Sequence, residues 1–211
     1  LAYLEKELIE HHYDLKYLYR LILTSRTYQF SSMPRFNNPE AEANFASYPI
    51  RRLDAEVLID AVNAITGTTD LYTSAIPEPF TYIPKDQPAI ALADGSITSP
   101  FLALFGRSAR ATGMLNERDN SPLPSQALHM LNSSHIQKKL EQSPKLKALL
   151  SSGRQPEEII EEFYLLILSR RPTEEELKTN SEYAKASSSK WNAGLDISWA
   201  LINSTEFLYR H

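Results

Sequence analysis

The chain has no cysteine and few glycines, and both shortages narrow the chemistry open to it. Without cysteine, these 211 residues contain no disulfide, catalytic thiolate, Cys-bearing zinc site or attached c-type haem. The six glycines form no Gly-rich phosphate-binding loop. A Gly-x-Ser-x-Gly nucleophile elbow is also missing, so the sequence gives no support to a serine hydrolase of that type.

Positive charge and long apolar runs are scarce as well. The formal net charge of -4 argues against a nucleic-acid partner, which would require a basic surface. No run of about 18 apolar residues occurs, so the sequence predicts no membrane-spanning helix. Among the five histidines, His129 and His135 are six residues apart and are expected on different helix faces. No pair has the zincin spacing, and we expect no metal site.

Helical periodicity is the main signal that is present. Apolar residues recur at helical spacing over about 1–25 and 50–66, with Asp14 as an expected N-cap and Gly67 as a C-cap. These features predict a mainly α protein, a multi-helix orthogonal bundle. Later helices are expected to begin near Ser125, Ser134, Ser143, Pro156, Thr173 and Trp191.

Residues 68–100 interrupt this pattern as one long irregular, Pro-rich insertion, because its prolines preclude long helices. Asp94-Gly95-Ser96 indicates a turn, which predicts a small β-hairpin from strands at 90–93 and 97–99. We expect a single helical domain over 1–211 that contains the insertion. Since the chain starts at Leu1 within a helical pattern, we interpret it as a fragment of a longer protein.

Charged residues are densest in segment 105–134, and a second group lies at the start of the helix at 50–66. Arginines beside carboxylates form a buried brace, a ligand-binding site, or an acid–base pair whose pKa values are separated by burial. We favour the brace over ligand binding, and ligand binding over catalysis. The bracket residues, as we name this set, are Arg51, Arg52, Glu56, Arg107, Arg110, Glu117, Arg118 and Asp119.

Two arrangements of the bracket residues are open from the sequence. Arg52 and Glu56 are four residues apart on one helix face, where a solvated pair contributes roughly 0.3–0.5 kcal/mol. Arg51 or Arg52 could instead point inward, toward Glu117 or Asp119, which would join the two groups into one ionic network. Glu117 with Asp119 is the first pair to test for catalysis.

Three aromatic residues of the insertion are candidates for stacking on sugar rings: Tyr72, Phe80 and Tyr82. Tyrosines also crowd the N-terminal helices. The alternative, which we favour, is that the tyrosines line a helix–helix seam with their hydroxyl groups at its edge.

Six strings occur along the chain in a fixed order: LYRLILTSRTYQ (18–29), RRLDAEVLIDA (51–61), Glu117-Arg118, PLPSQALHMLNSS (122–134), LSRRPTEEEL (168–177) and LINSTEFLYRH (201–211). Together they resemble the planctomycete-type C-terminal domain of unknown function numbered fifteen-fifty-three, over essentially the whole chain. The resemblance implies a domain that ends large exported proteins with a cytochrome c domain upstream. It implies no catalytic residues.

The resemblance and the residues together lead to an expected function. We expect a non-catalytic C-terminal docking or scaffold module, periplasmic or at the cell surface, associated with cytochrome c and polysaccharide utilisation. Its partners would be upstream domains of the same chain, and any haem would belong to those domains, with no cofactor in this segment. The alternative is a carbohydrate-binding or carbohydrate-active domain that uses the insertion aromatics and the polar segment 107–119. A redox partner surface is a third hypothesis.

Overall fold

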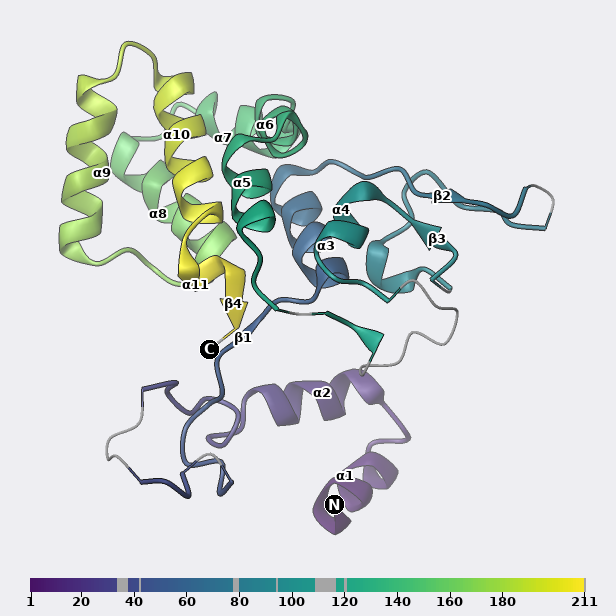
Figure 1. Cartoon of the computed structure of the whole chain (residues 1–211). Helices are drawn as coiled ribbons and strands as arrows, with labels where there is room; N and C mark the ends of the chain where they lie inside the picture. Colours follow the sequence, from purple (N-terminus) through teal and green to yellow (C-terminus); the bar gives the residue numbers. More distant parts are fainter. Residues whose placement is uncertain are drawn as a thin grey trace. The chain divides into compact units, whose positions relative to one another are not determined.

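The computed structural model describes residues 1–211 except 34–37, 42, 78–79, 94, 109–116, 120 and 211, and except the side chain of Arg210. The described chain is mainly α, which confirms the predicted fold class (Figure 1). Every helix predicted to begin between residues 125 and 191 is present and starts within one residue of its predicted position. Caps and helical periodicity were therefore sufficient to locate these elements.

The contacts of the chain divide it into two compact units, Leu1–Arg51 and Arg52–Arg210. The single domain expected over 1–211 stays a prediction. The helices of the first unit are α1 (Ala2–Glu10) and α2 (Leu15–Leu23). Asp14 caps α2 as predicted, since its carboxylate accepts hydrogen bonds from the backbone amides of Lys16 at 2.9 Å and Tyr17 at 3.2 Å.

The second unit is built around α3, the helix predicted at 50–66. The side chains of Leu58, Ile59 and Val62 are at most 1% exposed, and each such burial stabilises the fold by about 1.5–3 kcal/mol. Gly67 ends the helix in the left-handed conformation at φ 70°, as expected. From Arg51 onward the described elements are β1 (Arg51–Arg52), α3 (Ala55–Thr66), β2 (Thr73–Ser74), η1 (Ala89–Ala91), β3 (Ile97–Thr98), α4 (Pro100–Leu104), α5 (Pro124–Asn132), α6 (Ser134–Glu141), α7 (Pro144–Leu150), α8 (Pro156–Leu168), α9 (Glu174–Ala186), α10 (Lys190–Ile202), α11 (Thr205–Leu208) and β4 (Tyr209–Arg210).

Helix α10 is the centre of the C-terminal half, where it packs against α6, α7, α8 and α9 (Figure 1). Its close approach to α7 depends on Gly194, because a Cβ atom there would lie 2.6 Å from a methyl carbon of Leu150. Small residues at such crossings let helices pack at short distance without strained side chains. The C-terminal helices thus form a well-packed scaffold.

The hairpin predicted inside the insertion is wrong in its first strand. β3 does form at Ile97–Thr98, but it pairs antiparallel with β2, with Thr73 opposite Thr98. Residues 89–91 instead form the 3-10 helix η1, because the carboxylate of Asp60 on α3 accepts hydrogen bonds from the amides of Ala89 at 2.7 Å and Ile90 at 2.9 Å. Asp94, in the predicted turn, lies outside the described residues.

The string LSRRPTEEEL forms a three-helix junction. Arg170, just after α8, binds Glu176 on α9 at 2.8 Å and Glu206 on α11 at 2.6 Å. Thr173 and Glu176 also form the predicted capping box, in which the Glu176 carboxylate accepts a 2.7 Å hydrogen bond from the Thr173 amide. One carboxylate therefore both caps α9 and holds the arginine.

This junction predicts acid sensitivity. Hydrogen bonds from Arg170 hold the pKa of Glu176 at about 2, below its ordinary value of 4.5. Because the folded-state pKa is the lower one, the stabilisation is complete above about pH 4.5 and is lost as the pH falls toward about 2. We expect the urea midpoint to fall less steeply over this range in Glu176→Gln than in the parent. The neighbouring Glu175→Gln is the matched control, and identical slopes in all three proteins would contradict the prediction.

Candidate functional site

Arg107 and Arg118, two of the bracket residues, meet at the buried carboxylate of a third, Glu56, in the first turn of α3. Glu56 is 3% exposed. Its Oε1 accepts a hydrogen bond from Arg107 Nε at 3.0 Å, and its Oε2 accepts one from Arg118 Nη1 at 2.6 Å. Burial acts to raise the pKa of Glu56, but the Arg118 hydrogen bond and the charges of both arginines outweigh it and lower the pKa. Glu56 is therefore a carboxylate held ionised between two cations.

Arg107 reaches Glu56 because the chain turns sharply at Gly106 after α4. Gly106 has φ 84°, and a Cβ atom there would lie 1.7 Å from the carbonyl oxygen of Asp119. The Gly106 carbonyl accepts a 3.1 Å hydrogen bond from the Asp119 amide, and Arg107 Nη1 also donates to the carbonyl of Ile97 on β3. Only glycine allows this backbone approach. The turn brings the insertion, α3 and the segment around Asp119 to one point.

Arg52 points inward but does not bind the partners considered from the sequence. Within the described ranges it forms no ion pair with Glu56; its Nη2 donates to the Phe105 carbonyl at 3.0 Å and its Nη1 donates to Gln126 Oε1. The Gln126 amide in turn donates to the Leu104 carbonyl at 2.9 Å. Arg52 therefore ties the start of the second unit to the end of α4 and the first turn of α5.

Two further bracket residues, Asp119 and Glu117, have hydrogen-bond partners of their own. The exposed carboxylate of Asp119 accepts a hydrogen bond from the Ser121 amide at 3.0 Å, and Glu117 accepts one from the Ser108 hydroxyl at 3.0 Å. Arg51 is exposed on β1, and Arg110 lies outside the described residues. The two charged groups of the sequence are thus joined through Glu56, and the arrangement is that of a brace.

A second polar cluster was missed in the sequence. His135 Nε2 lies 2.9 Å from Asp70 Oδ1, and Lys139 Nζ lies 3.3 Å from Asp70 Oδ2 and 2.6 Å from Asn63 Oδ1. His129 Nε2 lies 3.4 Å from His135 Nδ1, so the expectation that these two rings are on different faces of a helix was wrong. Helix α5 ends before Ser133 and α6 begins after it, so the two histidines lie on separate helices. Their rings face each other.

The side chains of this cluster hold α6 against the end of α3 and the loop that follows it. Burial lowers the pKa of Lys139, and burial with the neighbouring His135 charge lowers the pKa of His129. The i, i+4 spacing of His135 and Lys139 was the available sequence signal. Among the described residues, no group of three or more His, Asp or Glu is placed to hold a metal ion.

The three aromatic candidates for sugar stacking have different environments. Tyr72 is 8% exposed and belongs to the hydrophobic core, so its ring is not available for stacking, and that part of the hypothesis was wrong. Burial, with the nearby carboxylates Asp70 and Asp60, raises the pKa of its hydroxyl. Phe80 and Tyr82 are 84% and 76% exposed, so their rings remain accessible.

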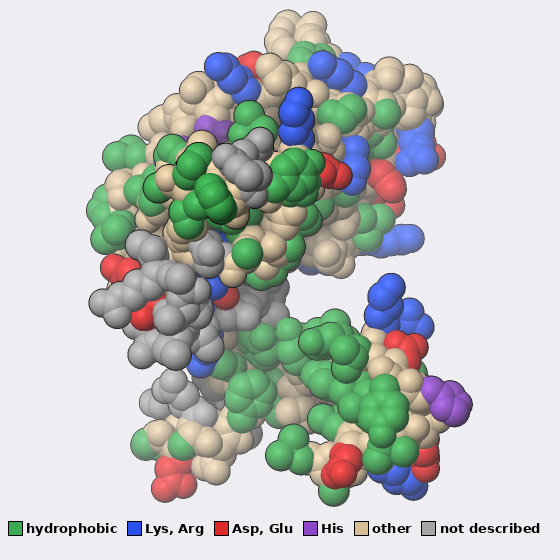
Figure 2. All heavy atoms as spheres, turned by 90° about the vertical axis from the view of Figure 1, so that its right-hand side faces the viewer, with side chains coloured by type: hydrophobic (Ala, Val, Ile, Leu, Met, Phe, Trp, Pro, Cys, Tyr) green, Lys and Arg blue, Asp and Glu red, His purple; other side chains and the backbone are tan. Residues whose placement is uncertain are grey.

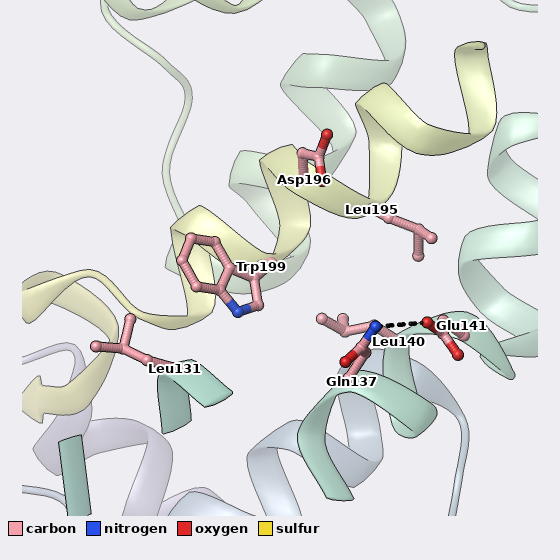
Figure 3. Close-up of a pocket in the computed structure, with 7 residues that line it drawn as sticks. All are labelled: Leu131, Gln137, Leu140, Glu141, Leu195, Asp196 and Trp199. Carbon is pink, nitrogen blue, oxygen red and sulfur yellow. Dashed lines mark hydrogen bonds between the residues drawn. The ribbon is translucent and has the colours of Figure 1, made fainter. Parts of the chain in front are cut away.

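A pocket of about 350 Å³ opens between α10 and the pair α5 and α6. This volume lies in the range of pockets that accept small molecules. Trp199 on α10 is 38% exposed and forms one wall (Figure 3). The pocket is lined by Leu131, Gln137, Leu140, Glu141, Leu195, Asp196 and Trp199.

The helices of the first unit carry a different kind of surface. Neither α1 nor α2 has a buried side chain. Leu15, Tyr19 and Leu23 on α2 are 59%, 64% and 48% exposed. Hydrophobic side chains gather over this unit in the space-filling view (Figure 2). Apolar groups concentrated on one helix face are typical of an interaction surface.

A comparison with protein families matches residues 1–184 to PSD1, described as a protein of unknown function (DUF1553). The chain belongs to this family. The PSD1 match includes α1, α2, the bracket residues and the Asp70 cluster, and it ends before α10. Comparisons with curated proteins and with solved structures gave no match. None of the described helices combines the length and apolar character that crossing a bilayer requires.

The brace in this PSD1-family chain predicts a large loss of stability when the charge of Glu56 is removed. Glu56→Gln would remove the buried negative charge that both Arg107 and Arg118 bind, and we expect a loss of about 3–5 kcal/mol in the free energy of unfolding, measured by urea denaturation. Glu157→Gln, which breaks the exposed pair of Glu157 with Lys185, is the control and should cost less than about 1 kcal/mol. A Glu56→Gln protein as stable as the control would show that the network is not a brace.

Proposed function

We propose that this chain is a non-catalytic docking module of a multidomain exported protein, located in the periplasm or at the cell surface. Its partner is an upstream domain of the same polypeptide, in a protein associated with cytochrome c and polysaccharide utilisation. Any haem belongs to that upstream part. The proposal extends the PSD1 family membership with the expectations drawn from the sequence resemblance.

The observation that carries the proposal is the exposed apolar stripe of α2. Leu15, Tyr19 and Leu23 follow one another at four-residue intervals, so they lie on one face of the helix. Lys16 and Arg20 come directly after Leu15 and Tyr19 in the sequence, so they flank the stripe on the helix. Burying the stripe against another domain would recover about 25 cal/mol for each Å² of apolar surface removed from water. A covalently linked partner needs only a small apolar surface to stay docked, because the linkage raises the partner's effective concentration.

The brace around Glu56 supports a structural role over a catalytic one. Both carboxylate oxygens of Glu56 already accept hydrogen bonds from arginines. A carboxylate held in this way stays ionised and is a poor general acid at neutral pH. Glu56, Arg107 and Arg118 therefore support the fold, and the proposal places recognition on the exposed surfaces.

Amide hydrogen exchange tests the docking proposal. We expect the amides of residues 15–23 to exchange about tenfold more slowly in the full-length parent protein than in residues 1–211 alone, because docking would protect α2. Leu15→Glu with Leu23→Glu should abolish that protection, whereas the control Lys16→Glu, beside the stripe, should retain it. Equal exchange in the parent and in residues 1–211 would contradict docking through α2.

A carbohydrate-binding role is the second candidate, supported by the exposed rings of Phe80 and Tyr82 in the insertion. Exposed aromatic rings stack on the apolar faces of sugars while nearby polar groups bind the hydroxyls. This role would use a surface of the second unit.

A glycan array that includes sulfated polysaccharides tests this candidate. We expect any specific glycan hit to weaken about tenfold in Phe80→Ala with Tyr82→Ala, because both stacking surfaces would be lost. Ile90→Ala, which removes a 65% exposed aliphatic side chain from the same insertion, is the control and should retain binding. An array without a specific hit, or a hit unaffected by the aromatic substitutions, would reject this surface as a glycan site.

A further inference from the structure

The pocket at Trp199 is lined by apolar, aromatic, amide and acidic side chains from three helices. On α10, Asp196 and Trp199 are three residues apart and line the same pocket; on α6, Gln137 and Glu141 are four residues apart (Figure 3). Leu131 on α5, Leu140 on α6 and Leu195 on α10 supply the apolar part of the lining. A ligand in this pocket would therefore meet an apolar floor, an indole ring and the Glu141 carboxylate, while the Asp196 carboxylate at the pocket's edge is directed toward Tyr183 of α9 (Figure 3).

The charge of the lining is of one sign. Glu141 and Asp196 are the charged members of the lining set, and no Lys, Arg or His is among those seven residues. Each carboxylate has one hydrogen-bond donor within the described part of the chain: Gln137 Nε2 at 2.9 Å for Glu141, and the Tyr183 hydroxyl at 2.5 Å for Asp196. A carboxylate can accept about four hydrogen bonds, so both retain acceptor capacity.

The Trp199 ring adds a second attraction for positive charge. The face of an indole attracts ammonium and guanidinium groups more strongly than any other aromatic side chain. Because Trp199 is 38% exposed, its ring is open to a ligand while still packed on one side. A neutral polyol would use the hydrogen-bond acceptors, but it would gain nothing from the negative charge of the two carboxylates.

We propose that this pocket binds an organic cation, a primary ammonium ion on an aliphatic stem. The stem lies against Leu131, Leu140 and Leu195, and the ammonium group donates hydrogen bonds to Glu141, in the field of Asp196 and the Trp199 ring. The site is independent of the docking surface on α2 and of the bracket residues. It requires no covalent step, since recognition rests on charge, shape and apolar contact.

Two-dimensional NMR of the ¹⁵N-labelled protein tests the proposal with n-hexylammonium chloride as the probe. We expect it to shift the indole N–H signal of Trp199, assigned with Trp199→Phe, and the side-chain amide signals of Gln137. n-Hexanol has the same stem without the charge, and we expect it to bind about tenfold more weakly. Equal binding of the amine and the alcohol would overturn the proposal, and so would tighter binding of methyl glucoside.

Matched substitutions assign the effect to the pocket. Glu141→Gln should reduce the affinity for n-hexylammonium about fivefold and leave that for n-hexanol unchanged, because it removes charge and keeps shape. Glu175→Gln removes one exposed carboxylate from α9 outside the pocket lining, and it should leave both affinities unchanged. An equal loss in these two variants would mean that the amine responds to net charge, and the assignment of the pocket would be wrong. Both variants alter exposed side chains, and unchanged melting temperatures verify that they fold.

Discussion

The buried carboxylate of Glu56 organises the second unit of this protein. It is bound by arginines that follow it by 51 and 62 positions, so one side chain of α3 fixes two distant segments of the chain. A charge removed from water is tolerated only when its partners are in place, and losing one partner costs far more than an exposed ion pair contributes. Arg107, which follows the Gly106 turn, links this carboxylate to strand β3 through the Ile97 carbonyl.

Two further groups of charged side chains also join separate segments of the second unit. Arg170 joins the ends of α8, α9 and α11, and the Asp70 cluster joins α6 to the loop after α3. Each junction uses polar groups to set how helices meet, while the apolar core supplies most of the stabilisation. Charged side chains that bind one another in this way are not available for chemistry, so our proposals place recognition on other surfaces. These are the α2 stripe, the aromatics of the insertion and the Trp199 pocket.

Local signals in the sequence were reliable wherever the deciding energy was local. Asp14, Gly67 and the Thr173–Glu176 capping box each act within one helical turn, and each forms as predicted. The hairpin prediction failed because Asp60, about thirty residues earlier, binds the amides of residues 89–90 and holds them as η1. A turn signal at Asp94-Gly95-Ser96 contains no information about that distant carboxylate.

By itself the sequence determined α3 and the helices from α5 to α10, the caps Asp14, Gly67 and Thr173, the charged groups that form the brace and the family resemblance, because periodicity, capping and string order are properties of short segments. Only the tertiary structure decided that Glu56 is the centre of the brace, that Arg52 binds carbonyl and amide oxygens, and that Tyr72 is buried while Phe80 is exposed. The partner of a buried charge is chosen by which segments pack around it and exclude water. That packing is a property of the whole fold, because every segment competes for the same interior.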